Sequence, residues 1–497
     1  MYKPGTLSLS NRVTIVIITA SLVLALLTVS IHLADPYLWF DEAGQFFISH
    51  GLNHYSDPLV QENGLSDVVK NNALYNLDPG GFSLLLHFWS KLSNSHIWLR
   101  LLPFSFFIGT VLAFIYLAYL GLEDLRLALL IGFIPIVMPA LRTAIEIRAY
   151  SMETLGSLIC IIAFVQLKNN ISIKHLFLWS VVLSGFITSR YSVIVVAFVI
   201  SLYVFHLIFI SDFSTKRRVI AILTYSTPLF STLVYIYFYS FNFQNRGLRS
   251  FGYLPYIGTD LTKIFSPFTS FLYLLFLLLL LLLCFYKDRI KFVMKHQKLL
   301  HIVVLTNLLF MGLSVLGVYP WSPFFRRNNS FVSITLLCLA VLLAELLLRA
   351  IRQPKTINYL LLTSLPIIAL GIGFNHTNLS RYQINTYSDL LTVDFDDYDR
   401  IYVDWWESAS IRYLFEYGAF RSRADVGYPE RFTFGDGISN VDFRDEDRRY
   451  EFIKTQPVMN EMVEYDLLIA PKLSEYGPTD KWRLVDGTTT LYIKSGS

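Results

Sequence analysis

Charged residues are scarce in this chain. Only 16% of its 497 residues are Asp, Glu, Lys or Arg, whereas 54% are hydrophobic. Soluble globular domains carry about 25% charged residues. The low charged fraction therefore argues against an ordinary soluble protein and predicts a chain that is solvated by lipid. No segment has the basic composition of a nucleic-acid-binding protein, so we expect no nucleic-acid partner.

Cysteine and the familiar cofactor motifs are also scarce or missing. The three cysteines, Cys160, Cys284 and Cys338, lie inside apolar runs, which is typical of core residues and excludes a disulfide framework. We find neither the glycine fingerprint of a dinucleotide fold nor a P-loop. No His, Cys and Asp cluster has ligand spacing. We therefore expect no metal site and no cofactor; a divalent cation is compatible with the sequence but not indicated by it.

Long apolar runs are abundant instead. A helix needs roughly 17–25 apolar residues to cross a bilayer. The first run, 13–34, is too long for a signal-peptide core and lacks a small-residue cleavage site, so we interpret it as a retained anchor. About ten further candidate spans follow, at 101–121, 126–141, 150–167, 174–188, 190–211, 218–240, 267–286, 299–319, 330–350 and 357–374.

The charges indicate how these spans are oriented. Lys and Arg are more frequent in the loops that are cytoplasmic if the N-terminus is cytoplasmic, which favours that topology. An odd number of spans then places the first loop, 35–100, and the tail, 376–497, outside. Residues 1–375 carry 27 Lys and Arg against 15 Asp and Glu, whereas the tail carries 14 against 22. This asymmetry predicts two regions in different chemical surroundings.

The tail has the pattern of a small α/β domain. RIYVDW, YDLLIA and TTTLYIK are typical of strands, and ESASIRYLFEYG is typical of a helix. The sequence thus predicts an α-helical polytopic membrane protein with about eleven transmembrane helices in residues 1–375, followed by an extracytoplasmic α/β domain in residues 376–497. The absence of cysteine from the tail favours a prokaryotic plasma membrane.

The first loop carries an unusual acidic pair. Two helices are expected there, one from Asp35-Pro36 to Gly51 and one opening at Asp78-Pro79, because Asp followed by Pro is a helix-start signal. The first contains Asp41 and Glu42 among aromatic residues. Neighbours on a helix point about 100° apart, so at most one carboxylate can face a cleft while the other bonds elsewhere. The alternative is that both belong to a solvated polar face.

A second cluster of charge lies at the outer end of a span. Arg142, Glu146, Arg148 and Tyr150 occur within nine residues. Arginine can hold a phosphate with two parallel hydrogen bonds, so Arg148 is a candidate clamp for a lipid phosphate. The alternative is an arginine that reaches toward the interface and pairs with Glu146. Arg190 and Arg326 are weaker candidates for phosphate binding.

Together these motifs resemble the GT-C superfamily of membrane glycosyltransferases, particularly the branch of protein O-mannosyltransferases, lipid A aminoarabinose transferases and family-39-like enzymes. The matching pieces are Asp41-Glu42 after the first span, the segment from Asp78 through His87 to Trp89 followed by Arg100-Leu-Leu-Pro, and Glu146-x-Arg148-x-Tyr150. The resemblance covers the first 200 residues, and beyond them it rests only on hydropathy and on the outside tail.

The resemblance implies a reaction. Asp41 would act as general base on an acceptor hydroxyl, with inversion at the sugar carbon; Glu42 would orient it, and Arg148 would neutralise the departing phosphate. The donor would be a polyprenyl-phosphate sugar, and the acceptor a lipid, a glycan or a protein of the cell envelope. Besides Arg148, the candidate substrate-binding residues are Tyr150, Glu146, Arg190, Asp78, His87 and Arg326. A single imidazole on an aromatic helix, such as His87, is more often a packed core residue than a ligand.

The chain departs from this family at one point. Many members have His or Lys before two prolines, where this chain has Asp78-Pro79-Gly80. A basic residue there would hold the carrier phosphate, and Asp78 cannot. Asp78 is better explained as a helix cap, with the lost charge supplied by Lys70, Lys91 or Arg190, or with a different acceptor.

Other functions fit parts of the pattern. A flippase or transporter of polyprenyl-linked sugar would also need many spans and outward arginines, although the halves show no symmetry. A ligase that moves a whole glycan from a pyrophosphate lipid, and a relative that binds the lipid-linked sugar without turnover, are further alternatives.

The Trp405-Trp406 pair of the tail could stack on an acceptor sugar or simply form the core.

Overall fold

The computed structural model describes most of the chain in separate stretches. These are residues 9–52, 63–76, 78–138, 146–241, 289–315, 329–350, 381–403, 405–420, 432–434, 465–469, 482–485 and 491–494. The described part is mostly helical, with five short strands near the C-terminal end.

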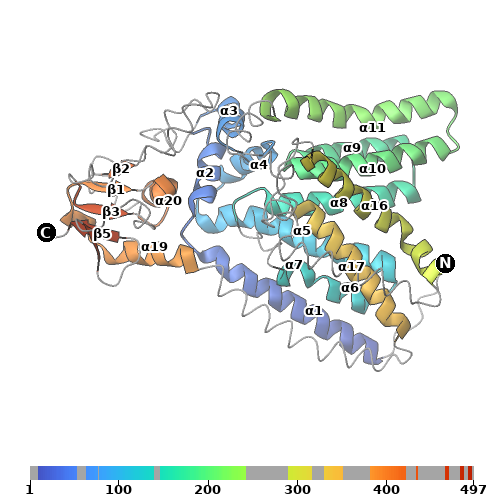
Figure 1. The fold of residues 1–497 in the computed structure, drawn as a ribbon, viewed down its shortest axis with the longest axis horizontal. Helices are drawn as coiled ribbons and strands as arrows, with labels where there is room; N and C mark the ends of the chain where they lie inside the picture. Colours follow the sequence, from blue (N-terminus) through green and yellow to red (C-terminus); the bar gives the residue numbers. More distant parts are fainter. Residues whose placement is uncertain are drawn as a thin grey trace.

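A bundle of long helices, joined by shorter helical segments, forms one end of the molecule (Figure 1). They are α1 (Leu9–Ser30), with the 3-10 turn η1 (Ile31–Ala34), α5 (His96–Leu122), α6 (Leu125–Ile131), α7 (Ile134–Val137), α8 (Tyr150–Asn169), α9 (Ile173–Ile187), α10 (Tyr191–Ile210), α11 (Thr215–Ile236), the π-helical turn η3 (Tyr237–Phe241), α16 (Arg289–Val315) and α17 (Asn329–Ala350).

Several of these helices are long and apolar enough to span a membrane. Within the described residues, five meet this criterion by length and composition. They are Asn11–Ala34, His96–Leu122, Tyr150–Asn169, Tyr191–Ile210 and Thr215–Ser240. Four apolar helices are shorter, and the predicted spans 267–286 and 357–374 lie outside the described residues. A helical membrane protein is therefore supported, whereas the total of eleven spans stays a prediction.

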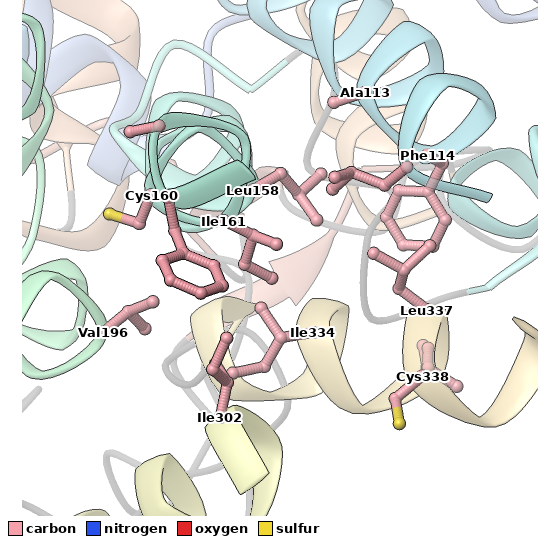
Figure 2. Packing of buried hydrophobic residues seen from close by; sticks show 14 of the residues in the cluster. Ala113, Phe114, Leu158, Cys160, Ile161, Val196, Ile302, Ile334, Leu337 and Cys338 are labelled. Carbon is pink, nitrogen blue, oxygen red and sulfur yellow. The ribbon is translucent and has the colours of Figure 1, made fainter. Parts of the chain in front are cut away.

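The core of this bundle forms around α8. Leu158 and Ile161 of α8 pack against Phe114 of α5 on one side and against Ile334 of α17 on another, as Figure 2 shows. Large apolar side chains on α1, α10 and α11 remain exposed, among them Leu24, Phe198 and Phe230. In lipid, such side chains are solvated, and close packing rather than the hydrophobic effect holds helices together.

One predicted span is broken. The run 126–141 forms α6 and α7, which are separated at Gly132 and Phe133, instead of one continuous helix. Pro135 explains the break, because proline lacks the N–H that a continuing helix would use and its ring clashes with the preceding turn. Residues 139–141 of this run lie outside the described residues.

Three helices of the first loop lie between the bundle and the strands. They are α2 (Phe40–Ser49), α3 (Leu65–Tyr75) and α4 (Gly81–Ser90). Our prediction of two helices missed α3. The start predicted at Asp35-Pro36 is wrong, since residues 35–39 are extended and α2 begins at Phe40. The Asp35 carboxylate accepts a hydrogen bond from the Tyr37 N–H at 3.1 Å, which forms a turn in place of a helix cap.

The second predicted start is also shifted. Helix α4 begins at Gly81 rather than at Pro79, after Gly80 adopts a left-handed conformation with a φ of 95°. The Asp78 carboxylate accepts a hydrogen bond from the Gly80 N–H at 3.1 Å, so Asp78 caps the turn before the helix. At the other end of α4, Trp89 stacks on Trp98 of α5 with ring centroids 4.4 Å apart.

The C-terminal part is a mixed sheet with two helices. Its elements are α19 (Arg381–Thr392), η5 (Phe395–Asp397), β1 (Ile401–Val403), α20 (Trp405–Glu416), β2 (Phe432–Phe434), β3 (Leu467–Ile469), β4 (Trp482–Leu484) and β5 (Leu491–Lys494). The strand order is β2-β1-β3-β5-β4, with β1 parallel to β2 and β3 and with β5 antiparallel to β3 and β4.

The predicted strands and helix of this part match β1, β3, β5 and α20. Ile411 and Leu414 of α20 pack on Ile401 and Leu467 of the sheet. The opposite side of α20 lies against α2 (Figure 1), where Tyr413 contacts Phe46 edge to face at 5.1 Å. The C-terminal sheet and the first loop therefore share an interface.

Candidate functional site

The two carboxylates of α2 point to different surroundings. Asp41 keeps 34% of its side chain exposed, whereas Glu42 is fully buried. Both lie in the first turn of the helix, where the helix dipole favours negative charge. The two carboxylates therefore have different surroundings, as the spacing of neighbours on a helix requires, and whether Asp41 faces a cleft stays a prediction.

Glu42 is held by three donors. Its Oε1 accepts a hydrogen bond from the Ile147 N–H at 2.9 Å, and its Oε2 accepts from the Trp39 N–H at 3.3 Å and from the Arg100 guanidinium at 3.1 Å. Arg100 is itself buried, and it also donates to the carbonyl of Tyr37 at 2.7 Å. Glu42 thereby fixes the start of α2 against α5 and against the segment before α8.

Burial dominates the ionisation of Glu42. Desolvation raises the pKa of Glu42 to about 7, although the charge of Arg100 and the N–H groups of Ile147 and Trp39 oppose this rise. A carboxyl group so enclosed cannot easily exchange a proton with a ligand. Its geometry suits a structural clamp.

Arg148 faces Asp41. One guanidinium nitrogen lies 3.9 Å from the Asp41 carboxylate, and another donates to the Asp41 backbone carbonyl at 3.3 Å. Its buried Nε has no hydrogen-bond partner among the described residues. Burial alone would lower the pKa of Arg148, but Asp41, Tyr150 and other nearby acids raise it, so the guanidinium stays charged. This loose pair leaves donor capacity for an anion.

Two arginines lie close to one tyrosine ring. Arg148 lies 5.9 Å and Arg190 4.7 Å from the centroid of the Tyr150 ring, within the range of cation–π attraction. Arg190 also contacts the buried carboxylate of Glu153 at 3.0 Å. Glu153 in turn accepts hydrogen bonds from Ser192 at 2.6 Å and from the backbone and side chain of Ser330, both at 3.1 Å. The two guanidinium groups are thus held on one side of the site.

The loop around Asp78 approaches the same place. Both Arg148 and Arg190 act electrostatically on the Asp78 carboxyl, whose pKa burial nevertheless raises. Gly81 explains the approach: its N–H donates to the Thr188 carbonyl at 2.9 Å, and a Cβ atom at Gly81 would lie only 1.8 Å from the Thr188 hydroxyl. Glycine is therefore required where α4 meets the turn before Arg190.

His87 is separate from this cluster. It is buried, its Nδ1 donates to the Ser49 carbonyl at 2.7 Å, and its ring packs edge to face on Phe88. This position favours the packed core residue over the substrate-binding role for which His87 was also a candidate. A buried network of neutral side chains lies nearby, in which Gln45, Asn72, Asn76 and Ser83 are hydrogen-bonded to one another and join α2, α3 and α4.

Most of the predicted site residues come together. Asp41, Glu42, Glu146, Arg148, Tyr150, Asp78 and Arg190 gather where α2, α8, α10 and the loop before α4 meet. Arg326 and Arg142 lie outside the described residues. Three residues were proposed to replace the basic residue that the family has at the position of Asp78. Lys70 and Lys91 are exposed, whereas Arg190 acts electrostatically on the Asp78 carboxyl.

Two residues of the site were not predicted from the sequence. Arg100 was noted only as part of a motif, because its partner Glu42 lies 58 positions earlier. Glu153 was not considered. Its position inside an apolar span was a usable signal, since ionisable residues in membrane segments usually have a functional partner.

The described residues contain no group of three or more His, Cys, Asp or Glu side chains that could hold a metal ion.

No protein-family model matches the chain, and a search of curated proteins gave no match. The resemblance to the GT-C superfamily therefore rests on the motifs and remains a prediction.

Proposed function

We propose that this protein is an inverting glycosyltransferase that moves a sugar from a polyprenyl-phosphate carrier to a cell-envelope acceptor at the outer face of a membrane. The observation that carries the proposal is the contrast within the acidic pair. Asp41 is accessible and lies beside Arg148, whereas its neighbour Glu42 is enclosed and immobilised. An accessible carboxylate next to a group of arginines suits acid–base chemistry on an anionic lipid.

The reaction assigns a role to each group. Asp41 takes the proton from the acceptor hydroxyl as that oxygen attacks the anomeric carbon of the sugar. The bond between this carbon and the phosphate oxygen breaks, and its electron pair leaves with polyprenyl monophosphate. Positioned bases contribute typically about 10²–10⁴-fold to the rate. Arg148 and Arg190 stabilise the charge that develops on the leaving phosphate.

The arrangement of the arginines supports a bound phosphate. The Nε of Arg148 has no hydrogen-bond partner among the described residues, and Tyr150 and Glu153 hold Arg190 in place. Preorganised donors of this kind stabilise a transition state without reorganising during the reaction. We place this site, and the C-terminal sheet beside it, on the outer side of a prokaryotic plasma membrane, following the distribution of Lys and Arg in the loops.

The test measures carrier release. Purified protein in nanodiscs is incubated with a panel of polyprenyl-phosphate sugars and a membrane-lipid extract, and polyprenyl monophosphate is quantified. Asp41→Asn should reduce the release rate by about 10²–10⁴-fold, because the amide cannot accept the proton. Asp67→Asn is the matched control, since Asp67 is an acidic residue of α3 in the same loop.

Other outcomes would redirect the assignment. Release that survives Asp41→Asn would contradict Asp41 as the base. Release of a diphosphate would favour the transfer of a whole glycan from a pyrophosphate lipid. Binding of labelled donor without release of carrier from any sugar would contradict a transferase and favour a flippase or a lipid-binding protein.

A further inference from the structure

We propose that the C-terminal region positions the two halves of the candidate site through a chain of four hydrogen-bonded residues, Glu407, Tyr37, Arg100 and Glu42. Glu407 and Tyr37 are then positioning residues that contact neither the sugar nor the phosphate. The assignment of a catalytic consequence rests on the proposed function. The structural coupling itself does not.

The chain begins where α20 meets the extended segment before α2. The Tyr37 hydroxyl donates a hydrogen bond to the Glu407 carboxylate. Both side chains are buried, and the Tyr37 ring packs in the core of the C-terminal sheet beside Ile411 and Phe415. A residue of the first loop is therefore a structural part of the C-terminal region.

The chain continues through the backbone of the same tyrosine. The Tyr37 carbonyl accepts a hydrogen bond from Arg100 at 2.7 Å, and the same guanidinium nitrogen contacts Glu42 at 3.1 Å. Arg100 and Glu42 are only 2% and 0% exposed, so solvent screens these contacts weakly. A displacement of Tyr37 would be transmitted to Glu42 because these contacts are buried away from bulk solvent.

Glu42 is the point at which the chain reaches the site. It directly follows Asp41 in α2, and its Oε1 holds the N–H of Ile147, which directly precedes Arg148. One carboxylate therefore sets the separation between the backbones of Asp41 and Arg148. Catalytic groups must be held within a fraction of an ångström, so a shift at this junction would slow the chemical step more than it would weaken donor binding.

The experiment compares two hydroxyl deletions on the same interface. Tyr37→Phe removes the hydroxyl that bonds to Glu407 and keeps the ring and the backbone carbonyl. Tyr413→Phe is the matched control, because its hydroxyl also ties α20 to the first loop, by donating to the Asn94 carbonyl at 2.9 Å, but it is not a link of the chain. Hydrogen–deuterium exchange and steady-state kinetics are measured on the full chain in nanodiscs.

We expect Tyr37→Phe to increase hydrogen–deuterium exchange in residues 40–44 and 146–149. It should also lower kcat by roughly tenfold at an unchanged KM for the donor, because one buried hydrogen bond is lost. Tyr413→Phe should affect exchange only in α20 and near Asn94. Glu407→Gln keeps an acceptor for the Tyr37 hydroxyl and should restore most of the kcat that Glu407→Ala loses.

Each result separates the coupling from the activity. Equal exchange in the Tyr37→Phe and Tyr413→Phe proteins, or a kcat that falls equally in both, would overturn the proposal. Failure of Glu407→Gln to retain more activity than Glu407→Ala would also overturn it. If the wild-type protein releases no carrier but Tyr37→Phe still loosens residues 146–149, the proposed function fails and the coupling stands.

Discussion

Two acidic residues that are adjacent in sequence belong to regions of opposite character. Glu42 and Arg100 form a closed pair at 3.1 Å, with both side chains buried and with backbone N–H groups completing the contacts of the carboxylate. Asp41 and Arg148 form an open pair at 3.9 Å, and the carboxylate remains partly exposed. The comparison indicates that the closed pair maintains the structure so that the open pair can remain available to a ligand.

The largest expected effect concerns the closed pair. Glu42→Ala leaves the Arg100 charge buried without its partner, which typically costs about 3–5 kcal/mol of unfolding free energy. Asp41→Ala should cost less than about 1 kcal/mol, because a partly exposed pair contributes little. Chemical or thermal unfolding in detergent at pH 8 measures both. Similar losses in the two variants would break the distinction between the pairs.

A pH titration sharpens the same comparison. The pKa of Glu42 rises from its ordinary 4.5 to about 7 in the folded protein, chiefly because of burial. The folded state therefore holds this proton more tightly than the unfolded state. The resulting stability is complete below pH 4.5 and is lost as the pH rises toward 7, by about 3 kcal/mol in total.

Glu42→Gln removes this titration. Its unfolding free energy should change less than that of the wild type between pH 5 and pH 8, when both are measured in the same detergent. If the unfolding free energy of the Glu42→Gln protein changes with pH as strongly as that of the wild type, the pH dependence arises from another group.

The smallest expected effect concerns donor binding at the open pair. Arg148→Lys keeps the positive charge but loses the planar fork, so the KM for the donor should rise by roughly tenfold. Arg126→Lys is the matched control, because Arg126 also forms a close pair, with Asp124 at 2.7 Å, at a different place in the bundle. An unchanged KM in the Arg148→Lys protein would contradict phosphate binding by this residue.

Much of the architecture followed from local signals. Apolar runs located α1, α5, α8, α10 and α11, and the spacing of neighbours on a helix separated the surroundings of Asp41 and Glu42. Other features depended on distant contacts. Helix α2 begins at Phe40 because Asp35, Arg100 and Glu42 satisfy the backbone of the extended segment before it. Helix α3 was missed because its sequence, LSDVVKNNALY, is polar and lacks a start signal at Gly64.

The site shows the same division. Charge near the ends of spans indicated Arg148 and Arg190, since positive residues there need an anionic partner. The identity of each partner was not predictable, because Glu42 meets Arg100 and Ile147 across 58 and 105 positions. The sequence left open whether Arg148 pairs with Glu146 or binds a phosphate, and it did not indicate the contact of its guanidinium with Asp41 on α2.

The position of Tyr37 in the C-terminal core has a consequence for biosynthesis. Tyr37 and Glu407 are separated by 370 positions in the chain. At about 5–20 residues per second, the ribosome needs roughly 20 to 70 s to make the second after the first. Throughout that interval the segment before α2 lacks the core that will enclose Tyr37. The earliest loop of the protein therefore reaches its final conformation only after one of the latest helices has been synthesised.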